Sequence, residues 1–306
     1  MKLKFLLFLG LSLSVALAAE EPVSLAGVID FHCHTGPDVV SRSITDFGLA
    51  RLARDAGLRA IVLKNHYTMT ADRAQLVMGE IPGIAVFGGI ALNRAVGGLN
   101  AEAVRRMAAM DGHRGKIVWL PTFDAEAQVR FSNEKRPFVA VVRDGKPMPE
   151  LAEIFQLIAQ NDLILATGHS SADESLVLIA AAKEAGVKRL LITHVLAESI
   201  GATPDHLRKF ADAGAILECT WLAHQPTGGP VNVGPTLAVA EAARAIKSIG
   251  AEHFLISSDL GQAGNPAHPT GLRAFIAALK AAGLTDRDID LLARKNPARL
   301  LSLEPW

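Results

Sequence analysis

The chain has 306 residues, of which half are hydrophobic, and its 31 basic side chains are balanced by 31 acidic ones. This is enough apolar material for a large core, and the balanced charge argues against a nucleic acid or an anionic membrane as partner. Aromatic residues make up only 5% of the sequence, which also argues against a surface on which bases stack.

The first 19 residues differ from the rest of the chain. Lys2 and Lys4 precede an apolar run from residue 5 to residue 18, which ends in the small–large–small pattern of residues 16–18. This layout is typical of a secretory signal peptide, and the run is short for the about 20 residues that span a bilayer. We expect cleavage after Ala18 or Ala19, export to a periplasm or secretion, and no membrane association afterwards. The alternatives are an uncleaved anchor and a wrongly assigned start codon of a cytoplasmic protein.

Eight short apolar runs rich in β-branched residues recur along the remaining sequence. Runs of this kind fit strands that are buried on both faces, as in a parallel sheet. The runs span Val28–His34, Ala60–His66, Ile84–Leu92, Lys116–Pro121, Leu163–His169, Arg189–Val195, Ala215–Thr220 and His253–Asp259. Amphipathic helical patterns fill most gaps, and several end at a glycine, the usual stop signal. Examples are Ile44–Ala56, Ala101–Met110, Ser171–Ala185, Pro204–Ala213 and Pro235–Ile249, with a further helical region at Thr285–Leu303.

This alternation predicts a single-domain (β/α)₈ barrel, the TIM-barrel fold, over residues 20–306. The alternative is an open doubly wound sheet, which would carry a glycine-rich phosphate-binding fingerprint after its first strand, where His32–Asp38 stands instead. An insertion, Asp124–Met148, follows the fourth run. Its segment Pro137–Pro147, with Asp144-Gly145 at the centre, predicts a β-hairpin.

The chain has two cysteines, Cys33 and Cys219. A chain of this size needs no disulfide for stability. Cys33 stands between two histidines that must face one way, so its own side chain must face the other. We expect both cysteines to be small buried hydrophobic residues.

Residue types that bind metals fall at the ends of the predicted strands. His32 and His34 end the first run, and residues two apart on a strand share a face. The active sites of (β/α)₈ barrels lie at these carboxyl ends. The later members of this set are Lys64, His66, His169, His194 and Asp259. A single such histidine is more often structural, but five with an aspartate at one mouth predict a divalent metal site. Imidazole and carboxylate ligands suit zinc, and also iron, manganese or nickel.

At this point the chain resembles the amidohydrolase superfamily of metal-dependent barrel hydrolases. The resemblance is carried by Val28–His34, His169, His194, Ser258-Asp259 and the segment Asn296–Leu301. It extends from Val28 to Leu301. More narrowly, His34–Asp38 with Arg42, and Lys64-Asn65-His66, resemble a little-characterised branch of that superfamily.

The resemblance implies roles for the ligand set. His32 and His34 would hold the more buried metal with Asp259, and His169 and His194 would hold a second, more exposed one. Asp259 would also accept the proton of the attacking water and pass it to the leaving group, with His194 as the other catalytic residue. The chemistry is reasonable, since a divalent metal lowers the pKa of bound water to about 7.

The chain departs from the family pattern at the residue that bridges two metals. Binuclear members usually use a carboxylated lysine or a glutamate from the fourth strand, whereas the fourth run here continues Trp119–Thr122 and has neither. Lys64 on the second run is the natural substitute, because its carbamate with CO₂ is a carboxylate. The alternatives are that Lys64 binds a substrate carboxylate or oxyanion, and that His66 is the ligand instead.

Other residues are expected around the ligands. Arg42, in the loop after the first run, could bind an anionic group of the substrate, or form a surface salt bridge. His66 and Asn93 are further candidates for substrate contacts. Asp30 precedes the histidine pair by two, so we expect it to share their face and to hydrogen-bond a ligand histidine.

Two residues flank the end of the seventh run, Glu218 and His224. His224 stands in a loop rich in proline and glycine. A substrate contact is one interpretation of it, and an ordinary loop residue is the favoured one.

These observations predict a metal-dependent hydrolase that cleaves a C–N or C–O bond of a small molecule, such as an amide, cyclic amide or lactone. A phosphoesterase on the same barrel would need more cations than Arg42, Lys64 and Arg94 supply. A decarboxylase of the same superfamily is another alternative. A non-catalytic periplasmic metal- or ligand-binding protein is a third, and Asp259 argues against it, because such a protein needs no proton acceptor.

Overall fold

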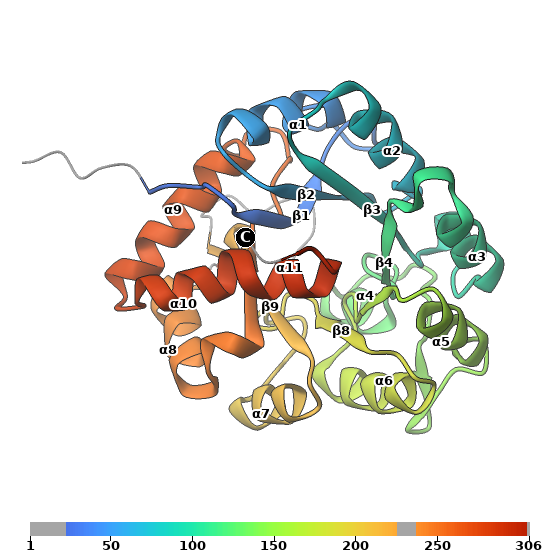
Figure 1. Cartoon of the computed structure of the whole chain (residues 1–306). Coiled ribbons are helices and arrows are strands. Elements are labelled where there is room, and N and C mark those ends of the chain that lie inside the picture. Colours follow the sequence, from blue (N-terminus) through green and yellow to red (C-terminus); the bar gives the residue numbers. More distant parts are fainter. Residues whose placement is uncertain (1–22, 225–236, 305–306) are drawn as a thin grey trace, which may run out of the picture.

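The computed structural model describes residues 23–224 and 237–304. Eight parallel strands form one sheet in the order β1-β2-β3-β4-β7-β8-β9-β10, and Figure 1 shows them as a ring enclosed by helices. The strands are β1 (Ile29–His34), β2 (Ala60–Lys64), β3 (Ala85–Ala91), β4 (Gly115–Trp119), β7 (Ile164–Ala166), β8 (Arg189–Ile192), β9 (Ile216–Thr220) and β10 (Phe254–Ser257). The predicted (β/α)₈ barrel is confirmed.

The ring closes between β1 and the segment that follows β10. The Asp259 amide donates to the His32 carbonyl oxygen, and the His34 amide donates to the Leu260 carbonyl oxygen, both at 2.9 Å. Cys33 and Leu260 form a parallel bridge at the same place. The barrel is therefore joined at the end that carries the histidine pair, and this joint brings Asp259 beside it.

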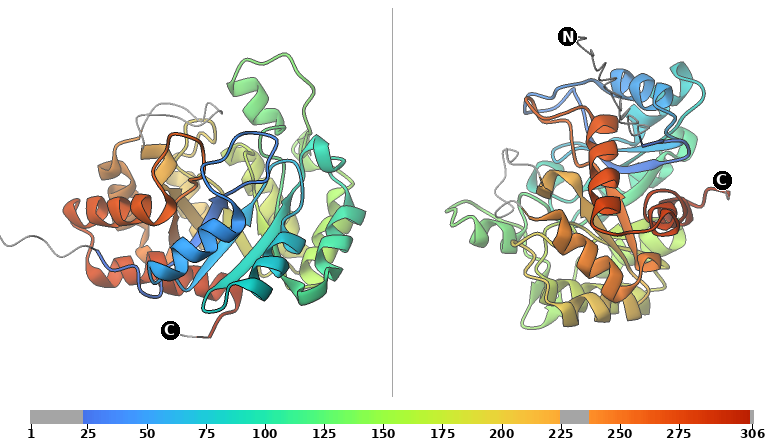
Figure 2. Two further views of the ribbon diagram at one scale, coloured as in Figure 1. Left: turned by 90° about the horizontal axis from the view of Figure 1, so that it is seen from above. Right: turned by 90° about the vertical axis from the view of Figure 1, so that its left-hand side faces the viewer.

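Helices surround the barrel and cover one of its ends. They are α1 (Asp46–Asp55), α2 (Ala71–Glu80), α3 (Ala101–Ala109), α4 (Glu126–Phe131), α5 (Leu151–Gln160), α6 (Ala172–Glu184), α7 (Pro204–Asp212), α8 (Val239–Ile249), α9 (His268–Ala281), α10 (Asp286–Asp290) and α11 (Asn296–Leu301). α11 lies across one end of the ring (Figure 1), where Ala298, Leu300 and Leu301 join the inner core. In Figure 2 the segment with α4 projects from the opposite end of the molecule. The histidine-bearing mouth is that opposite, open end.

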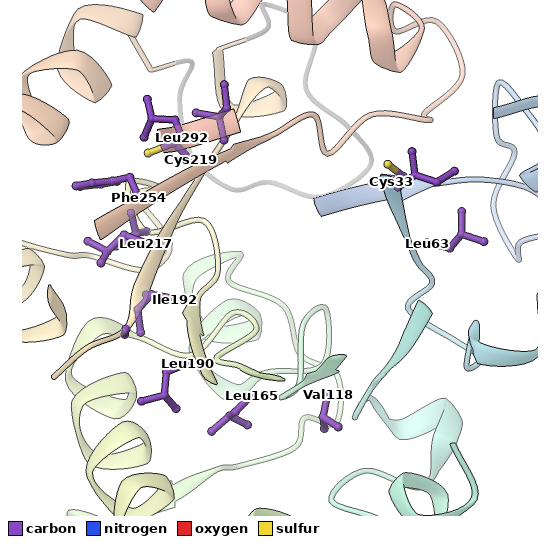
Figure 3. Packing of buried hydrophobic residues seen from close by; sticks show 14 of the residues in the cluster. Cys33, Leu63, Val118, Leu165, Leu190, Ile192, Leu217, Cys219, Phe254 and Leu292 are labelled. Carbon is purple, nitrogen blue, oxygen red and sulfur yellow. The ribbon is translucent and has the colours of Figure 1, made fainter. Parts of the chain in front are cut away.

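The apolar core has two layers. Phe31, Trp119 and other inward-facing strand residues fill the barrel. The outer layer packs strand residues such as Leu63 and Val118 against the helices, as Figure 3 shows. Cys33 and Cys219 lie buried and unpaired in this outer layer, which confirms the prediction for both cysteines.

The insertion after β4 contains the predicted hairpin. β5 (Val142–Arg143) pairs antiparallel with β6 (Lys146–Pro147). Asp144 and Gly145 both have positive φ, 51° and 71°, as a two-residue type I′ turn requires. The prediction of a hairpin is confirmed, although the paired part is shorter than the predicted segment.

Six of the predicted strands end earlier than the apolar pattern suggests, and in four of them a candidate site residue lies beyond the end of the strand. His66, His194 and Asp259 lie two residues beyond the last residue of β2, β8 and β10, and His169 lies three beyond that of β7. At two of these positions the cause is backbone conformation, because His194 and Asp259 have φ of 50° and 54°. A residue in the left-handed region turns the chain out of the sheet.

Within the described residues, no helix combines the length and apolar character that crossing a membrane demands. The predicted signal peptide, residues 1–19, lies outside the described part of the chain. So do the first two residues of the helix predicted at 235–249, and the described helix there, α8, begins at Val239.

Candidate metal centre

An irregularity in β1 directs the histidine pair into the barrel. Phe31 faces the inner core, so strict alternation would turn His32 away from the barrel axis. The pairing with β2 shifts register between Asp30 and Cys33, where three steps along β1 match two along β2. The extra residue resets the alternation, as β-bulges next to functional sites often do. Cys33 therefore packs in the outer core, while His32 and His34 face the mouth.

His32, His34 and Asp259 form the innermost group of the site, and all three are buried. Asp259 Oδ1 lies 3.1 Å from His32 Nε2 and 3.0 Å from His34 Nε2. Its other oxygen, Oδ2, lies 3.6 Å from His194 Nε2. Two ligands of a tetrahedral zinc ion lie about 3.4 Å apart when each is about 2.1 Å from the metal. These separations therefore fit side chains that share a divalent ion.

The other ring nitrogen of three histidines is held by a polar partner. These pairs are His32 Nδ1 with Glu218 Oε1 (3.1 Å), His169 Nδ1 with Gln128 Oε1 (3.1 Å) and His194 Nδ1 with Thr220 Oγ1 (3.4 Å). The carboxylate and the amide oxygen can only accept, so the Nδ1 atoms of His32 and His169 donate. Their Nε2 atoms therefore keep the lone pair, which is the form that binds a metal.

Glu218 is the central residue of β9 and completely buried. Its Oε1 also accepts from Ser257 Oγ at 2.7 Å, and its Oε2 has no hydrogen-bond partner among the described residues. With His32 and His194 it forms a second group that could hold a metal. Sequence reasoning noted Glu218 and gave it no role in the metal site. The available signal was an acidic residue inside a buried apolar run, which is rarely found unpaired.

Two further ring nitrogens make the site suitable for a cation. Within the described residues, His34 Nδ1 and His169 Nε2 are buried without a hydrogen-bond partner. The His169 ring centroid lies 5.2 Å from that of His194. Buried polar atoms are nearly always satisfied, and a metal would satisfy the lone pair of His169 Nε2. This unsatisfied nitrogen and the histidine and carboxylate donors around it fit a site for one or two divalent ions.

Lys64, the last residue of β2, points into the mouth. It is buried, and its Nζ lies 3.0 Å from His32 Nε2 and 5.3 Å from the ring centroid of Trp119. Burial lowers the pKa of its ammonium group to about 8, although Asp259 and Glu218 partly oppose this shift. The amine thus lies where either a bridging carbamate or a substrate contact would require it.

The electrostatics of the site favour neutral imidazoles and ionised carboxylates. Burial lowers the pKa of His194 to about 4 and the pKa of His169 well below its usual value. Burial raises the pKa of Glu218 and Asp259, but the interactions of these carboxylates with the ring nitrogens of His32 and His194 and with the Lys64 amine outweigh it, and both pKa values are lowered from their ordinary values. Neutral histidine and ionised carboxylate are the forms that coordinate metals.

His194 and Asp259 also occupy unusual backbone conformations. Both have positive φ near 50°, which is uncommon for residues other than glycine and costs free energy. Such conformations cluster at functional sites, where the surrounding structure enforces them. Here the enforcing contacts include the bond from the Asp259 amide to the His32 carbonyl. The backbone strain therefore coincides with two of the candidate ligands.

The predicted substrate-binding residues have different surroundings. The ring of His66 stacks between His34 and Phe123, with centroid separations of 4.8 and 3.7 Å. Its Nδ1 lies 2.8 Å from Thr122 Oγ1. His66 thus belongs to the wall of the cluster, beside His34.

Asn93 uses both ends of its amide within the protein. Its Nδ2 donates to the His66 carbonyl oxygen at 2.9 Å and to Thr122 Oγ1 at 2.7 Å. Its Oδ1 accepts from the Thr122 and Asp124 amides. The side chain therefore ties together the segments after β2, β3 and β4.

Arg42 forms an ion pair with Asp38, whose Oδ2 accepts from Arg42 Nε at 2.6 Å. The pair is not a surface salt bridge, because the two side chains are only 2% and 0% exposed.

The prediction for Asp30 is wrong. Its Oδ1 accepts from the backbone amides of Ser258 (2.9 Å) and His32 (3.4 Å) rather than from a histidine ring. The bulge after Asp30 places it on the opposite face from His32, and Glu218 takes the predicted position. Burial raises the pKa of Asp30 to about 6. His224 Nδ1 lies 2.7 Å from the Leu237 carbonyl oxygen, in keeping with an ordinary loop residue.

The barrel is structurally similar to several solved enzyme structures, among them two hydrolases and a decarboxylase. An organophosphorus hydrolase from Deinococcus radiodurans is 17% identical with a TM-score of 0.60, over 90% of this chain and 93% of that chain. An amidohydrolase from Pseudomonas aeruginosa is 12% identical, with a TM-score of 0.61 over 90% and 95% of the two chains. A 2,6-dihydroxybenzoate decarboxylase from Rhizobium is 13% identical, with a TM-score of 0.58 over 90% and 99%. At these identities the likeness establishes the fold.

The chain belongs to a family of unknown function (DUF6282), whose model matches residues 27–218. That range contains His32, His34, Lys64 and His194 and ends at Glu218. Asp259 therefore lies outside it. A comparison with curated proteins finds no match.

Proposed function

We propose that the protein is a metal-dependent hydrolase that cleaves a C–N or C–O bond of a small molecule with a water activated at this centre. One observation carries the proposal. The Nε2 atoms of His32, His34 and His194 converge on the Asp259 carboxylate at 3.0–3.6 Å, at the open mouth of the barrel. This is the end of a (β/α)₈ barrel at which active sites lie.

In this proposal, some side chains hold the metal and Asp259 also transfers the proton. His32, His34 and Asp259 would hold the inner ion, and His169 and His194 a second one, with Glu218 orienting His32 through Nδ1. When bound, a divalent metal supplies an activated water at neutral pH and polarises the scissile carbonyl. Asp259 is ionised, so its Oδ2 can accept a proton and return it to the leaving group. His194 Nε2 lies 3.6 Å from that same oxygen, so the proton acceptor would lie directly beside the second ion.

We propose zinc as the metal, because histidine nitrogens and carboxylate oxygens are its usual ligands in catalytic sites. A carbamate on Lys64 would add a carboxylate that two ions can share. Supplying ¹³C-labelled bicarbonate with zinc tests this directly by NMR. A carbamate carbon signal that is lost in Lys64→Met supports the bridge, and no signal in the wild-type protein overturns it.

An amide, a cyclic amide or a lactone is the proposed bond. A structure with the same fold, 17% identical over 90% of this chain with a TM-score of 0.59, is described as an organophosphate hydrolase obtained from a weak promiscuous lactonase template. The decisive experiment assays the zinc-loaded protein on matched lactone, amide and phosphotriester substrates, with Asp259→Asn as the control. Hydrolysis lost in Asp259→Asn supports the proposal. If the protein held stoichiometric metal but hydrolysed none of these substrates, a non-catalytic metal- or ligand-binding protein would be favoured.

The first 19 residues would place this activity outside the cytoplasm. We propose that they are removed on export and that the mature protein meets its small-molecule substrate in the periplasm or the medium. Expression of the full chain followed by amino-terminal sequencing of the secreted fraction tests this. A mature terminus at residue 19 or 20 is expected, and an intact Met1 in the cytoplasm would contradict it.

A further inference from the structure

The ring of His66 is held in one orientation at the wall of the metal centre. It is buried, and its faces stack on the rings of His34 and Phe123, with centroids 4.8 and 3.7 Å away. The ring centroid of His169 is 6.5 Å away. Within the described part of the chain, the side chain makes one hydrogen bond, between Nδ1 and Thr122 Oγ1 at 2.8 Å. The other ring nitrogen, Nε2, has no hydrogen-bond partner there.

The amide of Asn93 fixes the direction of the hydrogen bond between His66 and Thr122. Its Oδ1 accepts from two backbone amides, those of Thr122 and Asp124, and its Nδ2 donates to the His66 carbonyl oxygen. Backbone amides only donate and carbonyl oxygens only accept, so the orientation of the Asn93 side chain is determined. The second hydrogen of Nδ2 is therefore donated to Thr122 Oγ1, 2.7 Å away.

The hydroxyl of Thr122 must then donate to His66. Thr122 is completely buried, and among the described residues its Oγ1 has two hydrogen-bond neighbours, Asn93 Nδ2 and His66 Nδ1. The first of these can only donate. Because buried hydroxyl groups are nearly always satisfied, the hydrogen of Thr122 Oγ1 goes to His66 Nδ1. Nδ1 thus keeps its lone pair, and the neutral ring carries its hydrogen on Nε2.

This tautomer is the opposite of the one in two ligand histidines. His32 and His169 donate through Nδ1 to a carboxylate and to an amide oxygen, which leaves their Nε2 lone pairs for a metal. A ring nitrogen that carries a hydrogen cannot coordinate a cation, so His66 is not a ligand in this arrangement. The protein takes up both faces of the His66 ring and its Nδ1, and the edge with Nε2 is the part left for a substrate.

We propose that His66 is a catalytic hydrogen-bond donor, which binds the oxygen of the scissile carbonyl through its Nε2–H. This rests on the proposed function, since that oxygen becomes negative when water attacks the carbonyl carbon. His66 keeps its proton throughout and forms no covalent bond, so its part is to stabilise the negative charge. A donor that is already oriented does this well because it need not reorganise during the reaction. Thr122 and Asn93 are positioning residues, because they act on the substrate only through the ring.

Long-range ¹H–¹⁵N correlation NMR of the zinc-loaded protein reads the tautomer of each imidazole. The His66 ring should carry its hydrogen on Nε2, and its signals are assigned by their absence from His66→Phe. Thr122→Ser keeps the hydroxyl and should keep this tautomer. Thr122→Val removes the hydroxyl and should release the ring to a mixture of both tautomers. A His66 ring with its hydrogen on Nδ1 in the wild-type protein overturns the inference.

Kinetics of two variants test the role of the donor. His66→Phe keeps a ring between His34 and Phe123 but has no donor, whereas His66→Gln keeps an N–H near the position of Nε2. The substrate is the member of the lactone, amide and phosphotriester set that the wild-type protein hydrolyses fastest. We expect kcat to fall about 10²- to 10³-fold in His66→Phe, as for the loss of one oxyanion donor, and less in His66→Gln. KM should change little, because the bond strengthens in the transition state.

The possible results separate this role from the hydrolase proposal. Zinc content and thermal unfolding are measured on both variants, and both should stay folded with full zinc. Full activity of zinc-loaded His66→Phe would make the ring a part of the wall only, and the hydrolase proposal would stand. Loss of zinc from both folded variants would make His66 a ligand and also overturns the inference. If the wild-type protein hydrolyses none of the substrates, the hydrolase proposal falls, and the role of His66 falls with it.

Discussion

Glu218 Oε1 accepts a hydrogen bond from His32 Nδ1 at 3.1 Å, deep inside the barrel. Ser257 Oγ donates to the same oxygen at 2.7 Å, so the carboxylate is itself fixed in orientation. A carboxylate in this position locks the tautomer of the histidine and makes its other nitrogen a better ligand. The inner half of the candidate metal centre is therefore organised by two strands on opposite sides of the closing joint, β1 and β9.

Replacing Glu218 tests this organisation. Glu218→Gln keeps an acceptor for His32 Nδ1 but removes the charge, and Glu218→Ala removes both. We expect zinc affinity, measured by competition with a chelator, to fall about 10- to 100-fold in Glu218→Ala and less in Glu218→Gln. Ser257→Ala removes the hydroxyl that fixes this carboxylate but leaves the carboxylate in place, so it should lower zinc affinity less than Glu218→Ala does. Unchanged affinity in Glu218→Ala would show that this carboxylate neither orients nor binds.

Gly261 controls the closing joint of the barrel. Its φ is 119°, and a Cβ at this position would clash with the His34 carbonyl oxygen. Gly264, in the same loop, also has positive φ (90°), but a Cβ there meets nothing within 4 Å. We expect Gly264→Ala to lower the free energy of unfolding by about 1 kcal/mol from backbone strain alone. Gly261→Ala should lower it by about 3 kcal/mol or more, because backbone must also move.

Urea unfolding of the two alanine variants gives this comparison directly. Equal destabilisation would mean that the close approach of Gly261 to His34 is unimportant. A larger loss in Gly261→Ala, together with reduced metal affinity, would link closure of the barrel to the site.

The left-handed conformation of His194 gives a third expectation. Asparagine tolerates positive φ better than alanine does. The metal-free His194→Asn variant should therefore be about 1 kcal/mol more stable to urea than His194→Ala. Both variants lose the imidazole, so both should lose metal affinity to the same degree. If the alanine variant were the more stable one, the φ of 50° would not be a source of strain.

The fold was predictable from the sequence because its signals are local. Apolar runs mark the strands, glycines follow the helices, and Asp144-Gly145 gives the turn of the hairpin. The candidate metal-binding residues could also be predicted, because this prediction needs only the residue types at the ends of the apolar runs. The direction in which each side chain points was harder to predict. The bulge in β1 between Asp30 and Cys33 leaves no mark in residue types, so alternation counted from His32 wrongly put Asp30 on the metal side.

The missed role of Glu218 has a similar cause. Its importance depends on β9 lying next to β10 and near β1, which is a relationship between segments far apart in the sequence. The exact ends of the strands were also mispredicted, because the apolar pattern continues through residues such as His194, where a positive φ has already turned the chain away.

The measurement that tests the central claim most directly is the metal content of the purified protein, by inductively coupled plasma mass spectrometry after zinc supplementation and gel filtration. We expect at least one equivalent of zinc in the wild-type protein. His32→Asn, which removes the histidine that both candidate groups share, should retain only a small fraction of it while staying folded by circular dichroism. A wild-type protein without stoichiometric metal, or a His32→Asn protein with full metal content, would contradict the assignment.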